Sequence, residues 1–173
     1  MLSEFVDMVH ETAKNVMNGM HTAFPGEIVS FDPSTCRATI MPKMFFRIPS
    51  GGTLPYPNVS GVPVVIPQSA AQGTTIAFPI KPGDGCLVIV AEQSLDYWMY
   101  GINRDGNEGS DLGFDLTNAI CIPGLFVTPN AALAKACAEN AVVIQSPKVI
   151  VDGDLHVDGD LTVSGSYPYY DPN

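Results

Sequence analysis

Hydrophobic residues at the start of the chain recur with the spacing of an α-helix. They fall at steps of four and three, at Leu2, Val6, Val9, Ala13, Val16 and Met20. This spacing is typical of a heptad seam, so it predicts a helix with one apolar stripe within residues 1–23. Ser3 is placed to cap the N-terminus of this helix, and Pro25 prevents its continuation. The stripe fits packing either on the chain's own domain or against a neighbouring subunit or partner.

From residue 24 to residue 129 the pattern changes to short alternating runs separated by turns. Strands are expected at 27–31, 36–41, 62–66, 75–78, 86–91 and 115–122. The first two flank the turn Asp32-Pro33-Ser34-Thr35, as in a β-hairpin. Residues 86–91 are apolar at every position, which indicates a central strand buried on both faces. Short strands with Gly and Pro punctuation over about a hundred residues favour a small closed β-barrel.

Residues 130–141 are expected to form a short helical connector. Asn130 has the side chain of an N-cap, and the alanine-rich stretch after it favours a helix. A flexible connector is the alternative.

The most informative pattern lies in residues 142–173, where the sequence repeats every six residues from Val151 onward. The repeats read VDGDLH, VDGDLT and VSGSYP. Because six is an even number, each repeat keeps its side chains on the same faces of an extended strand. The even positions carry Asp, His, Thr and Ser, so that face is acidic and polar. The odd positions are apolar or glycine, namely Val151, Gly153, Leu155, Val157, Gly159, Leu161, Val163 and Gly165.

One chain cannot bury the apolar face of these repeats, because a hexad array is stable only when it stacks on copies of itself. Chains intertwined around a threefold axis would bury this face and pair the strand edges, with glycine where backbones approach closely. The sequence therefore predicts a homotrimer whose core is formed by the eight odd-position residues. Two ordinary turns at the Asp-Gly-Asp sequences are the alternative.

Charge and candidate chemistry narrow the function classes. The chain of 173 residues has 8 Lys and Arg against 18 Asp and Glu, a net charge of −10, which argues against nucleic-acid binding. No targeting segment is recognised, and the longest apolar run is far shorter than the roughly 20 residues of a membrane span, so synthesis in the cytoplasm is expected. We recognise no catalytic motif, cofactor site or metal-ligand set, and we therefore expect no enzyme. The four cysteines, expected to be small buried hydrophobic residues, are Cys36, Cys86, Cys121 and Cys137.

Four pieces of the chain, taken in order, resemble the central spike proteins of contractile tails. These are the phage baseplate assembly protein V group and the membrane-puncturing spike group, which also occur in R-type bacteriocins. The pieces are the hairpin from Gly26 to Pro33, the strand Val62-Pro63-Val64, the run from Phe78 to Val90 followed by Trp98, and the glycine-rich hexad tail.

The resemblance implies a mainly β fold with an N-terminal helix, an OB-like small β-barrel and a short intertwined trimeric β-helix. It implies a structural homotrimer that is made in the bacterial cytoplasm and sits at the baseplate tip of the assembled particle. There it would contact hub, tube and baseplate proteins, plug the tube and lead it toward the target-cell envelope. Membrane-puncturing members often end in a His-x-His apex that binds iron. The end of this chain, from Ser166 to Asn173, lacks that motif, so no axial metal is expected.

A different function class is also compatible with the sequence. OB-like barrels bind oligosaccharides in several families, and aromatic side chains provide the platform on which sugars stack. Tyr97, Trp98 and Tyr100 could form such a platform, which makes an oligosaccharide-binding module the alternative function.

Overall fold

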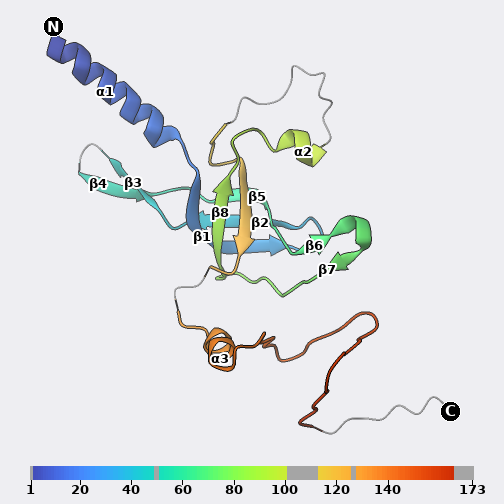
Figure 1. The fold of residues 1–173 in the computed structure, drawn as a ribbon. Helices are drawn as coiled ribbons and strands as arrows, with labels where there is room; N and C mark the ends of the chain where they lie inside the picture. The colour runs from blue at the N-terminus through green and yellow to red at the C-terminus, as the bar shows by residue number, and fades with distance from the viewer. Residues whose placement is uncertain (1, 49–50, 101–112, 126–127, 166–173) are drawn as a thin grey trace. The chain divides into compact units, whose positions relative to one another are not determined.

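The computed structural model describes residues 2–48, 51–100, 113–125 and 128–165 (Figure 1). The chain divides into two compact units, Met1–Thr128 and Pro129–Asn173. The first unit begins with helix α1 (Leu2–Gly19) and continues with strands and short helices. The second unit contains helix α3 (Ala131–Glu139) and the hexad tail. The fold is mainly β with an N-terminal helix, as the sequence predicts.

Helix α1 confirms the helix expected at the start of the chain. It already includes Ser3, so the prediction that Ser3 is the N-cap is wrong. The helix ends at Gly19, and the backbone N–H of His21 then donates to the carbonyl of Phe114 at 3.0 Å. From Ser3 to Gly19 every residue is exposed.

Five strands form one antiparallel sheet in the order β5-β2-β1-β8-β9. They are β1 (Ala23–Asp32), β2 (Arg37–Pro42), β5 (Val59–Pro63), β8 (Gly85–Val90) and β9 (Ala119–Pro123). The sheet curls until the chain just beyond β5 meets β9, where Val64 forms a parallel bridge with Cys121. The N–H of Val65 also donates to the Cys121 carbonyl at 2.8 Å. This five-stranded, partly open barrel confirms the predicted OB-like architecture.

The hairpin of β1 and β2 is held by its turn. One oxygen of the Asp32 carboxylate accepts from the backbone N–H and the hydroxyl of Ser34, at 2.9 and 2.6 Å. The other oxygen accepts from the Thr35 hydroxyl at 2.9 Å. These hydrogen bonds, led by that of the Ser34 hydroxyl, stabilise the ionised carboxylate, so the pKa of Asp32 lies below its usual value.

A register shift between Ile28 and Ser30 lets β1 contribute to the core along its whole length. Before the shift the inward residues are even-numbered, including Phe24 and Ile28. After it the odd-numbered Phe31 packs against the core. An extra residue in one strand reverses the side-chain alternation, which is the defining effect of a β-bulge.

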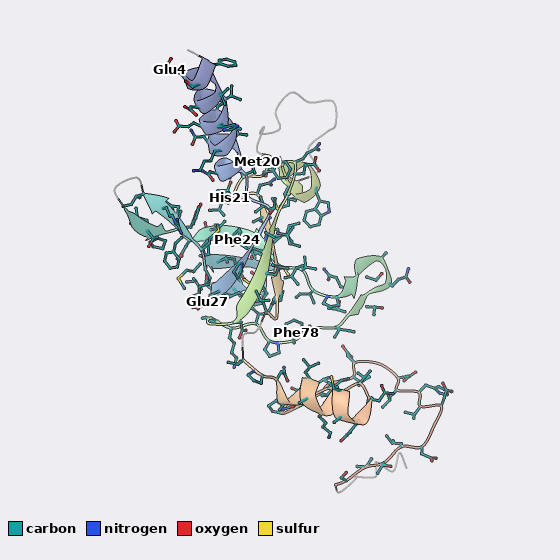
Figure 2. The ribbon with its side chains drawn as sticks, turned by 60° about the vertical axis from the view of Figure 1, so that its left-hand side comes forward. Glu4, Met20, His21, Phe24, Glu27 and Phe78 are labelled. Carbon is teal, nitrogen blue, oxygen red and sulfur yellow. The ribbon has the colours of Figure 1, made fainter. Side chains whose placement is uncertain are left out.

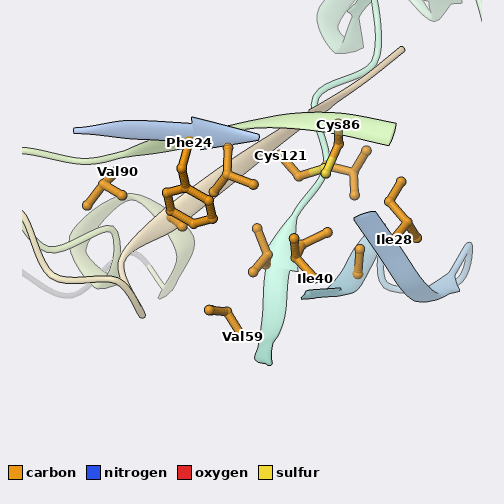
Figure 3. Close-up of a cluster of buried hydrophobic side chains, with 12 residues drawn as sticks. Phe24, Ile28, Ile40, Val59, Cys86, Val90 and Cys121 are labelled. Carbon is orange, nitrogen blue, oxygen red and sulfur yellow. The ribbon is translucent and has the colours of Figure 1, made fainter. Parts of the chain in front are cut away.

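The core lies inside the barrel and is mainly aliphatic, with one phenylalanine and two cysteines (Figure 3). Its largest fully buried side chains are those of Ile28, Ile40, Val62, Val88, Cys86 and Cys121. The remaining members are Phe24, Ala38, Val59, Val64, Val90 and Ala119.

Strand β8 differs from the prediction that residues 86–91 are buried on both faces. Cys86, Val88 and Val90 are buried, whereas Leu87 and Ile89 are 36% and 39% exposed. The reason is that this single sheet has an interior on one side only. Leu87 pairs with Ile122 across the strands, so the outer side of β8 and β9 is apolar as well.

Two further predicted strands are shorter than expected. Residues 75–78 were expected to be extended, but β7 (Thr74–Thr75) pairs only with β6 (Gln68–Ser69), on either side of a 3₁₀ turn at Ala70–Gln72. The strand expected at 115–122 begins at Ala119. The residues before it form a turn, because the Asp115 carboxylate accepts from the N–H and hydroxyl of Thr117.

Two small elements are inserted between barrel strands in the sequence. Strands β3 (Phe45–Ile48) and β4 (Gly52–Pro55) form a separate two-stranded hairpin, and the short helix α2 spans Asp96–Tyr100. In the second unit, the Asn130 side chain accepts from the N–H groups of Ala132 and Leu133, so the predicted helix after Asn130 is present. Among the described residues, none of the helices has the length and apolar character required to cross a bilayer.

Candidate subunit interface in the hexad tail

The hexad tail, residues 142–165, forms neither helix nor strand within a single chain. Its apolar residues at odd positions are largely uncovered. Their exposed fractions run from 43% at Val157 to 68% at Leu155. The other residues of this set are Val151, Leu161 and Val163. The chain thus presents a row of aliphatic side chains that nothing in its own fold buries.

The exposed aliphatic surface begins earlier than the repeat itself. Val142 is 92% exposed, and Ile144, Val149 and Ile150 are exposed too. The repeat predicts an interface that starts only at Val151, because these earlier residues lie outside the glycine phase. The two short aliphatic runs at residues 142–144 and 149–151 are the sequence feature that predicts this additional exposed surface.

The glycines of the repeat have no steric role inside one chain. A Cβ atom added at Gly153, Gly159 or Gly165 would meet no atom within 4 Å. Gly153 has a φ of +144°, which favours glycine by itself. Gly159 and Gly165 have no such backbone conformation, so neither crowding nor φ explains them in the isolated chain.

The polar side chains of the tail make local contacts. The Nε2 atom of His156 lies 2.9 Å from Oδ1 of Asp158, two residues further on. The Ser146 hydroxyl donates to the backbone carbonyl of Lys148 at 2.8 Å and accepts from the Lys148 N–H at 3.4 Å, which closes a local turn. The chain also bends at Gly153 and at residues 158–159, so the alternation of polar and apolar faces along the repeats stays a prediction.

Of the three aromatic residues expected to bind oligosaccharide, the structure describes the side chain of one. Trp98 on α2 is 74% exposed, while the side chains of Tyr97 and Tyr100 lie outside the described part of the structure. A different aromatic group, not foreseen from the sequence, joins His21, Tyr56 and Phe46. Their rings meet edge-on, with centroids 5.4 Å apart for His21 and Tyr56 and 5.2 Å apart for Phe46 and Tyr56.

The cysteines do not form a chemical site in the described structure. Cys86 and Cys121 are fully buried neighbours on β8 and β9 (Figure 3). The hydrogen bond with Cys86, and then burial, raise the pKa of the Cys121 thiol far above its ordinary value. Cys137 is exposed, so its predicted burial is wrong. Helix α3 has no buried residue. Among the described residues, no three His, Cys, Asp or Glu side chains are arranged to hold a metal ion.

Comparison with known proteins adds a family assignment for the barrel. The family model of the phage protein Gp138 N-terminal domain matches residues 24–124. The matched segment starts in β1 and ends just after β9, so it covers the five barrel strands and more than half of the chain. It leaves out all of α1, α3 and the hexad tail. No curated protein matches the chain.

Proposed function

The chain belongs to the family of phage proteins with a Gp138 N-terminal domain, and we propose that it is a structural part of the phage particle, a homotrimeric spike. In this proposal the trimer sits at the baseplate tip of a contractile tail. It plugs the tube, contacts hub and baseplate proteins, and leads the tube toward the target-cell envelope without catalysing a reaction.

The observation that carries the proposal is the uncovered apolar row of the hexad tail. Val151, Leu155, Val157, Leu161 and Val163 are each about half exposed or more in one chain. Completing the burial of such a side chain contributes on the order of 1 kcal/mol. Five per chain in three chains would contribute on the order of 15 kcal/mol, before the cost of association is subtracted. This gross contribution is of the same order as the cost of joining three chains, to which the main-chain hydrogen bonds between intertwined chains would add.

The glycine positions support the same arrangement. Because Gly159 and Gly165 have open space around them in one chain, a requirement for glycine there must come from outside that chain. Backbones that wind closely around a common axis have this requirement. The polar face, with Asp152, Asp154 and His156, would stay in water on the outside of the trimer.

Intertwined chains also suit a mechanical role. Main-chain hydrogen bonds would cross between chains, so unfolding would require the three chains to separate together. The unfolding barrier would then be high, and the assembled tail would be kinetically stable. A part that is pushed against an envelope needs such resistance more than it needs catalytic groups.

The proposal is tested by the mass of the full chain in solution. Multi-angle light scattering should give about 55 kDa, three times the 18.4 kDa of one chain, and the complex should resist SDS before boiling. The double variant Leu155→Asp, Leu161→Asp should be monomeric, because it would place carboxylates in the buried row. The matched variant Thr162→Asp, on the polar face, should remain trimeric. A monomeric wild-type chain at micromolar concentration would contradict the proposal.

One observation favours the alternative function as a second candidate. Trp98 is 74% exposed, and an exposed indole is a frequent stacking surface for sugars. A glycan array would detect oligosaccharide binding by the full chain. Binding that disappears in Trp98→Ala would support this function, and an array without signal would contradict it.

A further inference from the structure

Helix α1 presents a second apolar surface that the fold leaves uncovered. Of the seam residues, Val6, Val9 and Met20 are 45–46% exposed and Val16 is 61% exposed. Side chains radiate from all sides of the helix, from Glu4 near its start onward (Figure 2). An amphipathic helix of 18 residues gains most of its stability from packing of its apolar face. We therefore expect another surface to cover this face in the assembled protein.

The spacing of the seam indicates what kind of surface covers it. The steps of four and three alternate without interruption from Leu2 to Met20, so apolar residues recur at the same two heptad positions, a and d. A seam of this kind is the surface that a second helix covers in a coiled coil. The spacing is thus compatible with another helix as the partner, and the charges and the width of the seam favour it.

The charges of α1 indicate that the partner helix is α1 of another copy of this chain. With Val6, Ala13 and Met20 at position a, every charged residue of α1 falls at position b or f, away from the seam and its flanks. These residues are Glu4, Asp7, Glu11 and Lys14. Identical acidic helices can thus meet along the seam without placing like charges opposite one another.

The breadth of the stripe favours more than two helices. Phe5 at position g and Met17 at position e extend the apolar surface on either side of the seam, and they are 60% and 71% exposed. A two-stranded seam buries a and d alone, whereas flanking apolar residues find cover in larger bundles. A membrane surface is a poorer partner, because Lys14 is the only Lys or Arg of the helix and three acidic residues accompany it.

We infer that three copies of α1 associate in parallel as a short coiled coil in the assembled protein. This inference rests on the proposed trimer, because two and a half heptads are too short to associate strongly by themselves. Chains already joined through their tails would hold the helices at a high effective concentration, and modest affinity would then suffice. The trimer would be fastened at both ends of its sequence, with the family's barrel domain between them.

Disulfide trapping in the full chain tests the inference. The exposed Cys137 is first replaced by Ser, so that it cannot cross-link. Ala13→Cys then places a thiol at position a, where facing Cα atoms come within disulfide range. Glu11→Cys, at position f, is the matched control. With copper phenanthroline as oxidant, Ala13→Cys should give covalent dimers in up to two of every three chains, since a third thiol finds no partner. Glu11→Cys should give none.

The outcomes separate this inference from the proposed function. A particle of trimer mass in which Ala13→Cys fails to cross-link, or cross-links no better than Glu11→Cys, would overturn the coiled coil and leave the spike intact. A chain of monomer mass would overturn both. As a second measurement, Val9→Asp should speed hydrogen exchange in residues 2–19 at least tenfold while the mass stays that of a trimer. Unchanged exchange would also count against the coiled coil.

Discussion

A valine in place of Gly159 tests the crowding that the proposed trimer requires. In one chain a Cβ atom at this position meets nothing within 4 Å, and φ lies outside the left-handed region. Gly159→Val should therefore cost a single chain nothing, and the lower entropy of its unfolded state would even favour an ordered tail by about 0.5 kcal/mol. The isolated chain provides no reason for the variant to be defective.

In the trimer the same change is expected to be severe. Overfilling a packed site costs about 1–3 kcal/mol, and threefold symmetry repeats the site three times, so the penalty is about 3–9 kcal/mol. The lower figure alone weakens assembly about a hundredfold. The difference between no effect and a hundredfold effect makes the variant decisive.

The assay compares Gly159→Val with Ser164→Val. Ser164 lies on the polar face of the same repeat array, so valine there adds a similar bulk where the proposed trimer has room. Light scattering over a dilution series measures the concentration at which each trimer dissociates, and gels without boiling measure the temperature at which SDS resistance is lost. Far-UV circular dichroism should show an unchanged barrel in both variants.

Equal behaviour of the two variants would refute the reasoning. If Gly159→Val assembles at the same concentration as Ser164→Val and resists SDS to the same temperature, the apolar face is not crowded. The glycine phase of the repeat would then need another explanation, and the intertwined tail would lose its main support.

Three further predictions concern the barrel. Gly85→Ala should lower the free energy of unfolding by about 3 kcal/mol, measured by urea denaturation, because a Cβ there would overlap the carbonyl oxygen of Leu125; an unchanged midpoint would contradict this packing. Asn118→Ala should cost about 1–3 kcal/mol in the same assay, since the amide of this 6% exposed residue bonds backbone groups between residues 91 and 95. Hydroxyl and N–H donors lower the pKa of both Asp32 and Asp115. Their stabilising contribution is therefore complete above the unfolded value of about 4 and is lost as the pH falls through the lower folded values; Asp115→Asn should weaken the dependence of stability on pH below 4.

Features that depend on neighbouring residues could be predicted from the sequence. The β1–β2 hairpin follows from two alternating runs and a turn whose Asp32 side chain bonds the next residues. Helix α3 follows from Asn130, which caps it from the adjacent position. In both cases the signal and the structure lie within a few residues, so no knowledge of the rest of the fold is required.

Features that depend on what lies across the sheet could not be predicted. Leu87 and Ile89 have the composition of a strand buried on both faces, and only the arrangement of the whole barrel shows that their side is open. The start of β9 was misplaced because Asp115 bonds its own local turn instead of joining the ladder. The trimer interface remains a prediction, since one chain contains only one side of it.

The open tail also has a consequence for the fate of single copies during assembly. Proteases cleave exposed segments that lie extended and lack secondary structure, and residues 142–165 have this character in one chain. In the proposed trimer, association with two further copies would cover the tail, so a copy that stayed alone would lose its tail to digestion. Degradation would then act as quality control, removing unassembled copies before they could reach the proposed particle.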